Sequence, residues 1–174
     1  MKRSIRKRVH YAHPPERVWR ALTSREALAA WLMPNDFEPR VGHRFQFRTD
    51  PAPGFDGVVH CEVLEMEPPH RMVWSWRGGK IDTEVAFSLA PVAGGTELYF
   101  EQTGFEGVSG VLTSFILQAG FAKMYRELLP AVLDRLARGE PAPAPEACAH
   151  EHSKLGALFE RITARVAARF QRRG

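Results

Sequence analysis

One stretch past the middle of this chain limits the folds open to it, because it predicts a long helix with a single apolar side. From residue 121 to residue 136 the sequence reads FAKMYRELLPAVLDRL. Its large apolar residues recur at the spacing of one helical stripe. The stripe consists of Phe121, Met124, Tyr125, Leu128, Leu129, Val132 and Leu136. Such a helix needs an apolar surface to cover, and Gly139 is a typical stop signal beyond it.

The preceding chain supplies that surface as a series of short strands. Residues 4–11 alternate between apolar and charged side chains, and five further strand-like runs follow at 44–48, 58–67, 71–77, 81–89 and 96–103. Glycine pairs at 78–79 and 94–95 predict hairpin turns. Strands that are apolar on one side form an antiparallel sheet with one covered face and one wet face. Two short helices between Pro14 and Pro34, with Thr23 or Ser24 as the cap of the second, complete an α+β domain.

The long helix is not expected to be straight. Residues 112–119 place their apolar side opposite the stripe that begins at Phe121, which predicts a kink, a break or a second contact surface near Gly120. Pro130 removes one backbone donor inside the helix and predicts a further bend. A bent helix over a sheet leaves space beneath it.

Composition indicates one soluble domain in a reducing cytoplasm. The chain has 174 residues, and no apolar run is long enough to cross a membrane. Its basic start lacks the apolar core of a secretory signal. Two cysteines, Cys61 and Cys148, do not suggest a disulfide framework. Glu146, Cys148, His150, Glu151 and His152 lack zinc-type spacing, so no metal site is expected, and no phosphate loop or other motif indicates a cofactor.

The chain beyond residue 139 is interpreted as an appendage. Residues 140–152 form a linker rich in proline and alanine. Residues 153 to 174, with Ser153 as a cap and Gly174 at the end, form an amphipathic helix rich in arginine. It can pack on its own domain or on a second copy in a homodimer, lie on an anionic membrane surface, or dock on a partner protein. Nucleic acid is not expected, because no aromatic residues interleave with the arginines.

The order of elements over residues 5–139 resembles the START-like, or helix-grip, fold of the SRPBCC superfamily, which is also described as birch-allergen-like. Within it, the sequence is similar to the family of the C-terminal domain of the activator of heat-shock protein ATPase. The motifs that carry the resemblance lie at residues 13–23, 25–34, 61–76, 82–107 and 120–139. Two positions depart from it: many relatives have tryptophan where Phe121 stands and histidine where Gln102 stands, so no role of that histidine is transferred.

The resemblance implies a curved sheet of about six strands around the long helix, with a hydrophobic cavity between them. Members bind lipids, polyketides or other apolar small molecules, and some are cyclases or co-chaperones. The fold alone does not choose among these functions. Our first interpretation is non-catalytic binding of a hydrophobic, lipid-like or polyketide-like molecule in the cavity, and the alternative for its side chains is ordinary core packing. The predicted lining consists of Trp31, Phe45, Phe47, His60, Met72, Trp74, Trp76, Val85, Phe87, Leu98, Phe100, Gln102, Phe121, Tyr125, Leu128 and Val132.

Two other functions remain open. The strand at 58–67 is ambiguous because both of its faces contain apolar and charged residues, and we assign Val58, His60, Glu62, Leu64 and Met66 to the inside. His60 and Glu62 would then be candidates for the acid and base of a cyclase or hydrolase, or else a simple ion pair. The third interpretation is a co-chaperone-like interaction module that uses residues 153–174.

Overall fold

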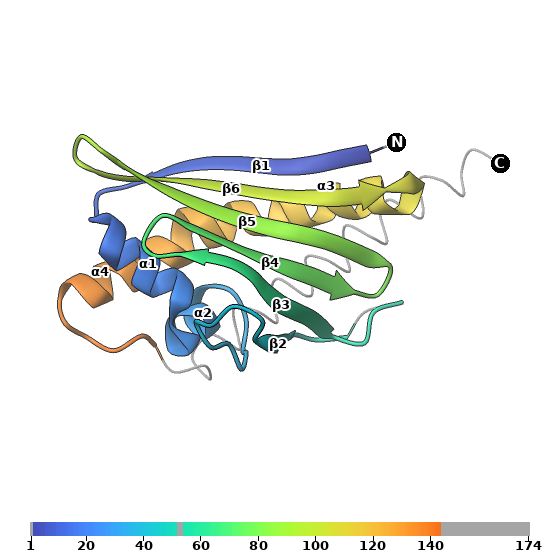
Figure 1. Ribbon diagram of the computed structural model, residues 1–174, viewed down its shortest axis with the longest axis horizontal. Helices are drawn as coiled ribbons and strands as arrows, with labels where there is room; N and C mark the ends of the chain where they lie inside the picture. The colour runs from blue at the N-terminus through green and yellow to red at the C-terminus, as the bar shows by residue number, and fades with distance from the viewer. Residues whose placement is uncertain (1, 52–53, 144–174) are drawn as a thin grey trace.

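Six strands form a single antiparallel sheet in the order β1-β6-β5-β4-β3-β2 (Figure 1). The computed structural model describes residues 2–51 and 54–143. The strands are β1 (Lys2–Tyr11), β2 (Arg44–Arg48), β3 (Val58–Glu67), β4 (Arg71–Gly78), β5 (Ile81–Val92) and β6 (Gly95–Glu106). The predicted strands and both glycine hairpins are confirmed, since Gly78 pairs with Ile81 and Val92 pairs with Gly95 across two-residue turns.

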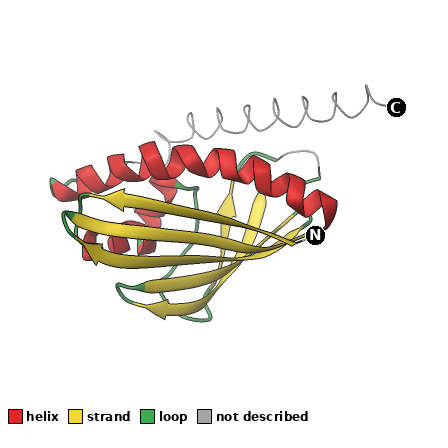
Figure 2. Ribbon diagram, turned by 90° about the horizontal axis from the view of Figure 1, so that it is seen from above, coloured by secondary structure: helices red, strands yellow, loops and turns green. Residues whose placement is uncertain are grey.

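A long helical rod lies over the concave face of the curved sheet (Figure 2). It consists of α3 (Gly107–Lys123), a π-helical turn η1 (Met124–Leu128) and α4 (Leu129–Ala137). The helices α1 (Pro15–Thr23) and α2 (Arg25–Trp31) pack against α4, while α3 packs mainly against β1 and β6. We call the side of the sheet under the rod the inner face and the other side the outer face. The α+β helix-grip architecture predicted from the sequence is confirmed.

The two short helices are separated by a capping serine. The hydroxyl of Ser24 accepts a hydrogen bond from the backbone N–H of Ala27 at 3.2 Å, which satisfies one of the donors left free at a helix start. Every residue of α2 from Ala27 to Trp31 is buried. The cap therefore fixes the point at which the chain turns its second helix into the core.

The irregularity of the long helix lies at η1 and not at Gly120. Gly120 is inside the continuous helix α3, whereas the N–H of Leu129 bonds the carbonyl of Met124, five residues earlier. A π turn of this kind inserts about one extra residue into the helix. It shifts the stripe that follows, so that Leu129 and Leu133 are fully buried while Leu128 is only half-buried. Leu128 still packs against the core as predicted, and Leu133 joins the buried side of the helix.

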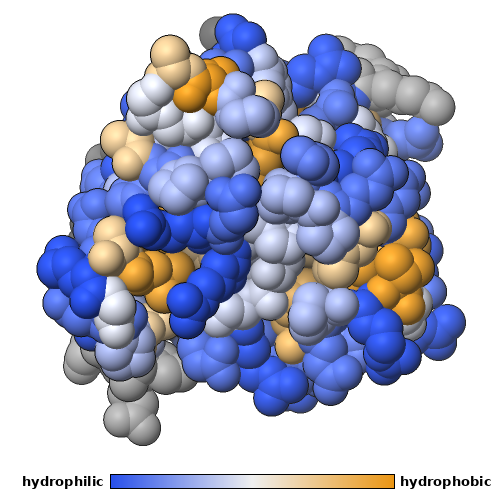
Figure 3. Space-filling view, turned by 60° about the vertical axis from the view of Figure 1, so that its left-hand side comes forward, coloured by the Kyte–Doolittle hydropathy of each residue, from blue (hydrophilic) through white to orange (hydrophobic). Residues whose placement is uncertain are grey.

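The large apolar residues are mostly inside the domain. Large apolar side chains with marked exposure include Val41, Leu64, Val92 and Tyr99, which lie on separate segments. On the face seen in Figure 3, apolar residues form small patches between hydrophilic ones. Within residues 2–51 and 54–143, no helix has the length and apolar character needed to cross a membrane. The terminal helix, nearly all of the linker and the cluster around Cys148 lie outside the described residues, so the proposed division of the chain remains a prediction.

Candidate functional site

The inner face carries a continuous cluster of aromatic rings, which we call the aromatic cluster. The ring of Trp74 on β4 lies 5.5 Å from Phe45 and 5.0 Å from Phe87, measured between ring centroids. Phe100 on β6 connects this group to the long helix, at 5.1 Å from Phe121 and 5.2 Å from Tyr125. Most of the pairs are edge-to-face or tilted, the arrangements that aromatic quadrupoles favour. The full cluster is Trp31, Phe37, Phe45, Phe47, Trp74, Trp76, Phe87, Phe100, Phe121 and Tyr125.

The rings of this cluster fill the space between sheet and helix. Each of them retains at most 4% of its accessible surface. Rings buried to this extent leave little open surface for a guest at these positions. The predicted cavity is thus occupied by its own lining at these positions, and a guest can enter only if the rings move apart.

Three buried polar atoms within this apolar core have no hydrogen-bond partner among the described residues. They are the indole nitrogen Nε1 of Trp74, the amide oxygen Oε1 of Gln102 and the hydroxyl of Tyr125. All three side chains are at most 1% exposed. Leaving a buried polar group unpaired costs about 1–3 kcal/mol each, so native structures seldom retain several together.

The orientation of the Gln102 amide follows from its neighbours. Thr83 donates its hydroxyl to the backbone carbonyl of Trp76 at 3.2 Å, and Gln102 Nε2 donates to the Thr83 oxygen at 2.9 Å. Since the Thr83 proton is already used, the amide must present nitrogen to Thr83 and leave its oxygen as a free acceptor. Gln102, Val85 and Trp74 are register partners across β6, β5 and β4. The free acceptor and the free indole donor therefore lie in one row, two strands apart.

The Tyr125 hydroxyl is a neutral group that can both donate and accept. Burial raises the pKa of Tyr125 well above its ordinary value of 10.0, with a smaller contribution from Tyr11. Its ring lies 5.7 Å from that of Trp31, whose indole N–H is satisfied by the carbonyl of Ala21 at 2.9 Å. Tyr125 belongs to η1, and π turns of this type are frequent at functional sites.

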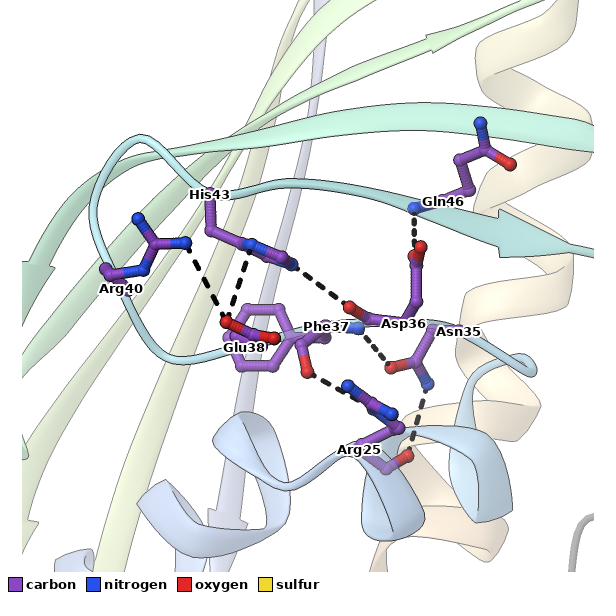
Figure 4. A network of polar contacts seen from close by, with 8 residues as sticks. All are labelled: Arg25, Asn35, Asp36, Phe37, Glu38, Arg40, His43 and Gln46. Atoms are coloured by element: carbon purple, nitrogen blue, oxygen red, sulfur yellow. Dashed lines mark hydrogen bonds and ion pairs between the residues drawn. The ribbon is translucent and has the colours of Figure 1, made fainter.

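Phe37 closes the aromatic cluster at the β2 end, and a polar network in the loop between α2 and β2 holds it there (Figure 4). The side chain of Asn35 accepts from the N–H of Phe37 at 3.0 Å and donates to the carbonyl of Arg25 at 3.2 Å. His43 contacts the carbonyl of Asp36 at 3.0 Å. The ring of Phe37 then lies 5.0 Å from Phe45. Sequence reasoning missed Phe37, because it stands alone in a loop without periodicity.

The proposed inward position of His60 and Glu62 is wrong. Val59, Cys61 and Val63 are the buried residues of β3, whereas His60 is exposed and Glu62 pairs with Arg44 at 3.1 Å on the outer face. The inward assignment of Val58 and Leu64 fails with them. A β-bulge between Val63 and Glu65 switches the alternation, so that Met66 pairs with the inner residue Met72. No single alternation describes this strand, which is why the sequence was ambiguous.

His60 lies instead beside an open surface pocket of about 740 Å³ at the Gly78–Gly79 end of the sheet. Its register neighbours there are Arg77 and Asp82, which form an exposed ion pair at 2.9 Å.

Within the part of the chain that is described, no three His, Cys, Asp or Glu side chains are placed to hold a metal ion. Burial raises the pKa of the Cys61 thiol, which keeps it protonated and unreactive.

Comparisons with known proteins agree with this architecture. Residues 12–134 match the family described as Activator of Hsp90 ATPase homolog 1-like protein. The chain belongs to this family. A search of curated proteins found no match.

Solved structures of several bacterial proteins resemble this AHSA1-like chain over most of its length. Protein MLL2253 from Mesorhizobium loti is 35% identical, with 76% of this chain and 98% of that chain covered and a TM-score of 0.70. Protein BH1534 from Bacillus halodurans is 25% identical, with 76% and 99% covered and a TM-score of 0.64. The Aha1 dimer from Colwellia psychrerythraea is 21% identical, with 77% and 96% covered and a TM-score of 0.62, and it shares the fold.

The other lining residues predicted for this AHSA1-like chain all lie in its buried core. Apart from His60 and Leu128, each predicted residue is at most 4% exposed. Their inward positions were correct, whereas a role in ligand binding is not tested by burial. Sequence reasoning missed Thr83 as the group that orients Gln102. The signal was a polar residue at an inward position of an otherwise apolar strand.

Proposed function

We propose that this AHSA1-like chain binds an apolar small molecule with a few polar groups between its sheet and its long helix, without transforming it. The observation that carries the proposal is the set of three unpaired polar atoms, on Trp74, Gln102 and Tyr125, within the aromatic cluster. Together they offer one donor, one acceptor and one hydroxyl that can do either. An apolar site with a few placed polar groups is the usual chemistry of small-molecule recognition.

The closed packing of the cluster requires a movement for binding. The helix α3 packs mainly on β1 and β6, at one side of the sheet, and the π turn η1 separates it from α4. We place the opening movement at this joint, because α4 packs on α1 and α2 while α3 packs on β1 and β6, so the two segments rest on different parts of the domain. The unbound state is then a closed one, and the ligand replaces ring–ring contacts with its own.

Native mass spectrometry of the protein purified from its own host, together with thermal shifts over a panel of lipids and polyketides, tests the proposal. Tryptophan fluorescence gives a second readout, because Trp31, Trp74 and Trp76 belong to the cluster. A bound mass, with a fluorescence change that is weakened in Tyr125→Phe and kept in the control Tyr99→Phe, is the expected result. Tyr99 lies on the outer face and is 39% exposed. Absence of bound mass and of any thermal shift across the panel would overturn the proposal.

A protein-binding role is the second candidate, and the family match favours it, since the family is named for activators of the Hsp90 ATPase. The solved Colwellia protein is described as a dimer, so self-association is part of the same candidate. Comparing the full chain with a variant that ends at residue 152, by light scattering and by pull-down with an Hsp90-type chaperone, separates these outcomes. Unchanged mass and unchanged capture would remove any role of residues 153–174.

A further inference from the structure

One lysine lies on the inner face of the sheet, where the other described residues are mostly apolar. Lys7 on β1 is the register partner of Phe100 on β6, with Ile5 and Val9 on either side of it along the same face. It is half-buried, whereas its neighbours Arg6 and Arg8 point to the outer face with side chains 76% and 65% exposed. Since neighbouring strands are ~5 Å apart, the Lys7 stem runs beside the Phe100 ring.

In the part of the chain that the structure describes, no carboxylate is paired with Lys7. The helix α3 contains no aspartate or glutamate along Gly107–Lys123. On β6, Glu97 and Glu101 are used on the outer face, where Glu97 pairs with Arg8 and Glu101 with Arg6. Within residues 2–51 and 54–143, the ammonium group of Lys7 takes part in no hydrogen bond or ion pair. A lysine that lies on the inner face of a sheet with its stem half-buried and has no counter-ion is uncommon, because charged side chains that leave water are usually paired.

Lys7 lies on the edge strand of the sheet, and this position defines how a ligand would be oriented. The strand β1 is the edge of the sheet beside α3 (Figure 1), so the stem of Lys7 covers the core while its ammonium group can reach the boundary with water. From there, Phe100 leads inward to Tyr125 and Phe121. Gln102, the register partner of Ile5, stands next to Phe100 on the same face. A molecule with a charged end and an apolar body would match this charged edge and apolar interior.

From this arrangement we infer that the ligand is an amphipathic anion, an apolar body that ends in a carboxylate or phosphate, with its head group paired to Lys7. The inference rests on the proposed function and specifies the substrate class of that same site. The apolar body would lie among the rings that Phe100 connects, and the head group would remain at the edge between β1 and α3. The ion pair supplies orientation, since the molecule can enter in one direction only.

Calorimetric titration with decanoate, decyl phosphate and decanol tests the inference, because these probes share one tail and differ in head group. The wild type should bind both anions about two-fold to five-fold more tightly than decanol, as expected for a partly exposed ion pair. Lys7→Met should lose this preference and keep the affinity for decanol, while Lys7→Arg should retain it. Lys80→Met is the matched control, since Lys80 is an exposed lysine in the turn between β4 and β5.

The outcomes separate the inference from the proposed function. Equal binding of all three probes by the wild type, or an anion preference that survives in Lys7→Met, overturns the inference and leaves the binding function standing. Binding of none of them overturns both. Thermal unfolding of each variant shows whether the fold is kept, and Lys7→Arg maintains the test if Lys7→Met unfolds.

Discussion

Tyr11 donates its hydroxyl to the backbone carbonyl of Tyr125 at 2.7 Å, which joins the first strand to the π turn of the long helix. In a regular α-helix that carbonyl would accept from Leu129, but the N–H of Leu129 bonds Met124 instead. The next candidate is Pro130, which has no N–H. Tyr11 therefore satisfies a carbonyl that the combination of a π turn and a proline leaves without a helical partner.

Removing the Tyr11 hydroxyl should leave the backbone carbonyl of Tyr125 without a hydrogen-bond donor. Tyr11→Phe is expected to lower the free energy of unfolding by about 1–3 kcal/mol, because a buried carbonyl loses its only donor. Pro130→Ala restores an N–H that can reach the Tyr125 carbonyl, so the cost of Tyr11→Phe should be smaller in that background. Urea unfolding of the two single variants and the double variant measures the coupling. Additivity within about 0.5 kcal/mol would contradict this account.

Two buried tryptophans allow a matched comparison, because both are fully buried and only one has a partner for its N–H. Trp31 donates to the carbonyl of Ala21 at 2.9 Å, while Trp74 Nε1 has none. Trp31→Phe should destabilise the protein by about 1–2 kcal/mol more than Trp74→Phe, since only the first change breaks a hydrogen bond. Equal losses in chemical denaturation would argue against the assigned bonding.

Tyr125→Phe is expected to stabilise the unliganded protein by about 1 kcal/mol, because it removes a buried hydroxyl without a partner. The same change should weaken ligand binding, which would mark the hydroxyl as a group kept for function at a cost in stability. Tyr99→Phe on the outer face should change stability by less than about 0.5 kcal/mol. A clear loss of stability in Tyr125→Phe would show that the hydroxyl is paired in solution.

Stability should fall steeply at high pH. Burial raises the pKa of Tyr11 and Tyr125 above their ordinary 10.0, and that of Cys61 above 9.0. Above these ordinary values the unfolded chain releases protons that the native state keeps, so the free energy of unfolding decreases as pH rises. Each group contributes a slope of about 1.4 kcal/mol per pH unit. Urea unfolding between about pH 8 and pH 11 should show a slope that is shallower in Tyr11→Phe than in the wild type, and an equal slope would contradict this account.

The stripe at residues 121–136 and the two-residue periodicity of the strands were enough to predict the fold. Alternation placed Trp74, Phe87 and Phe100 on the inner face, and the glycine pairs placed two hairpins, because these patterns depend on local backbone geometry. The same reasoning failed on β3, where the bulge after Val63 changes which side chains point inward. It also missed Leu133, which becomes fully buried because the π turn shifts the helical phase by about one residue.

The sequence by itself determined which elements form and which of their faces are apolar, because strand and helix periods are written in consecutive residues. Only the tertiary structure decided the candidate site. Whether a buried N–H or hydroxyl is paired depends on groups brought from distant segments, as Ala21 is brought to Trp31 and Tyr11 to Tyr125. The three unpaired atoms of the core and the unpaired ammonium group of Lys7 are likewise consequences of packing, which no local pattern encodes.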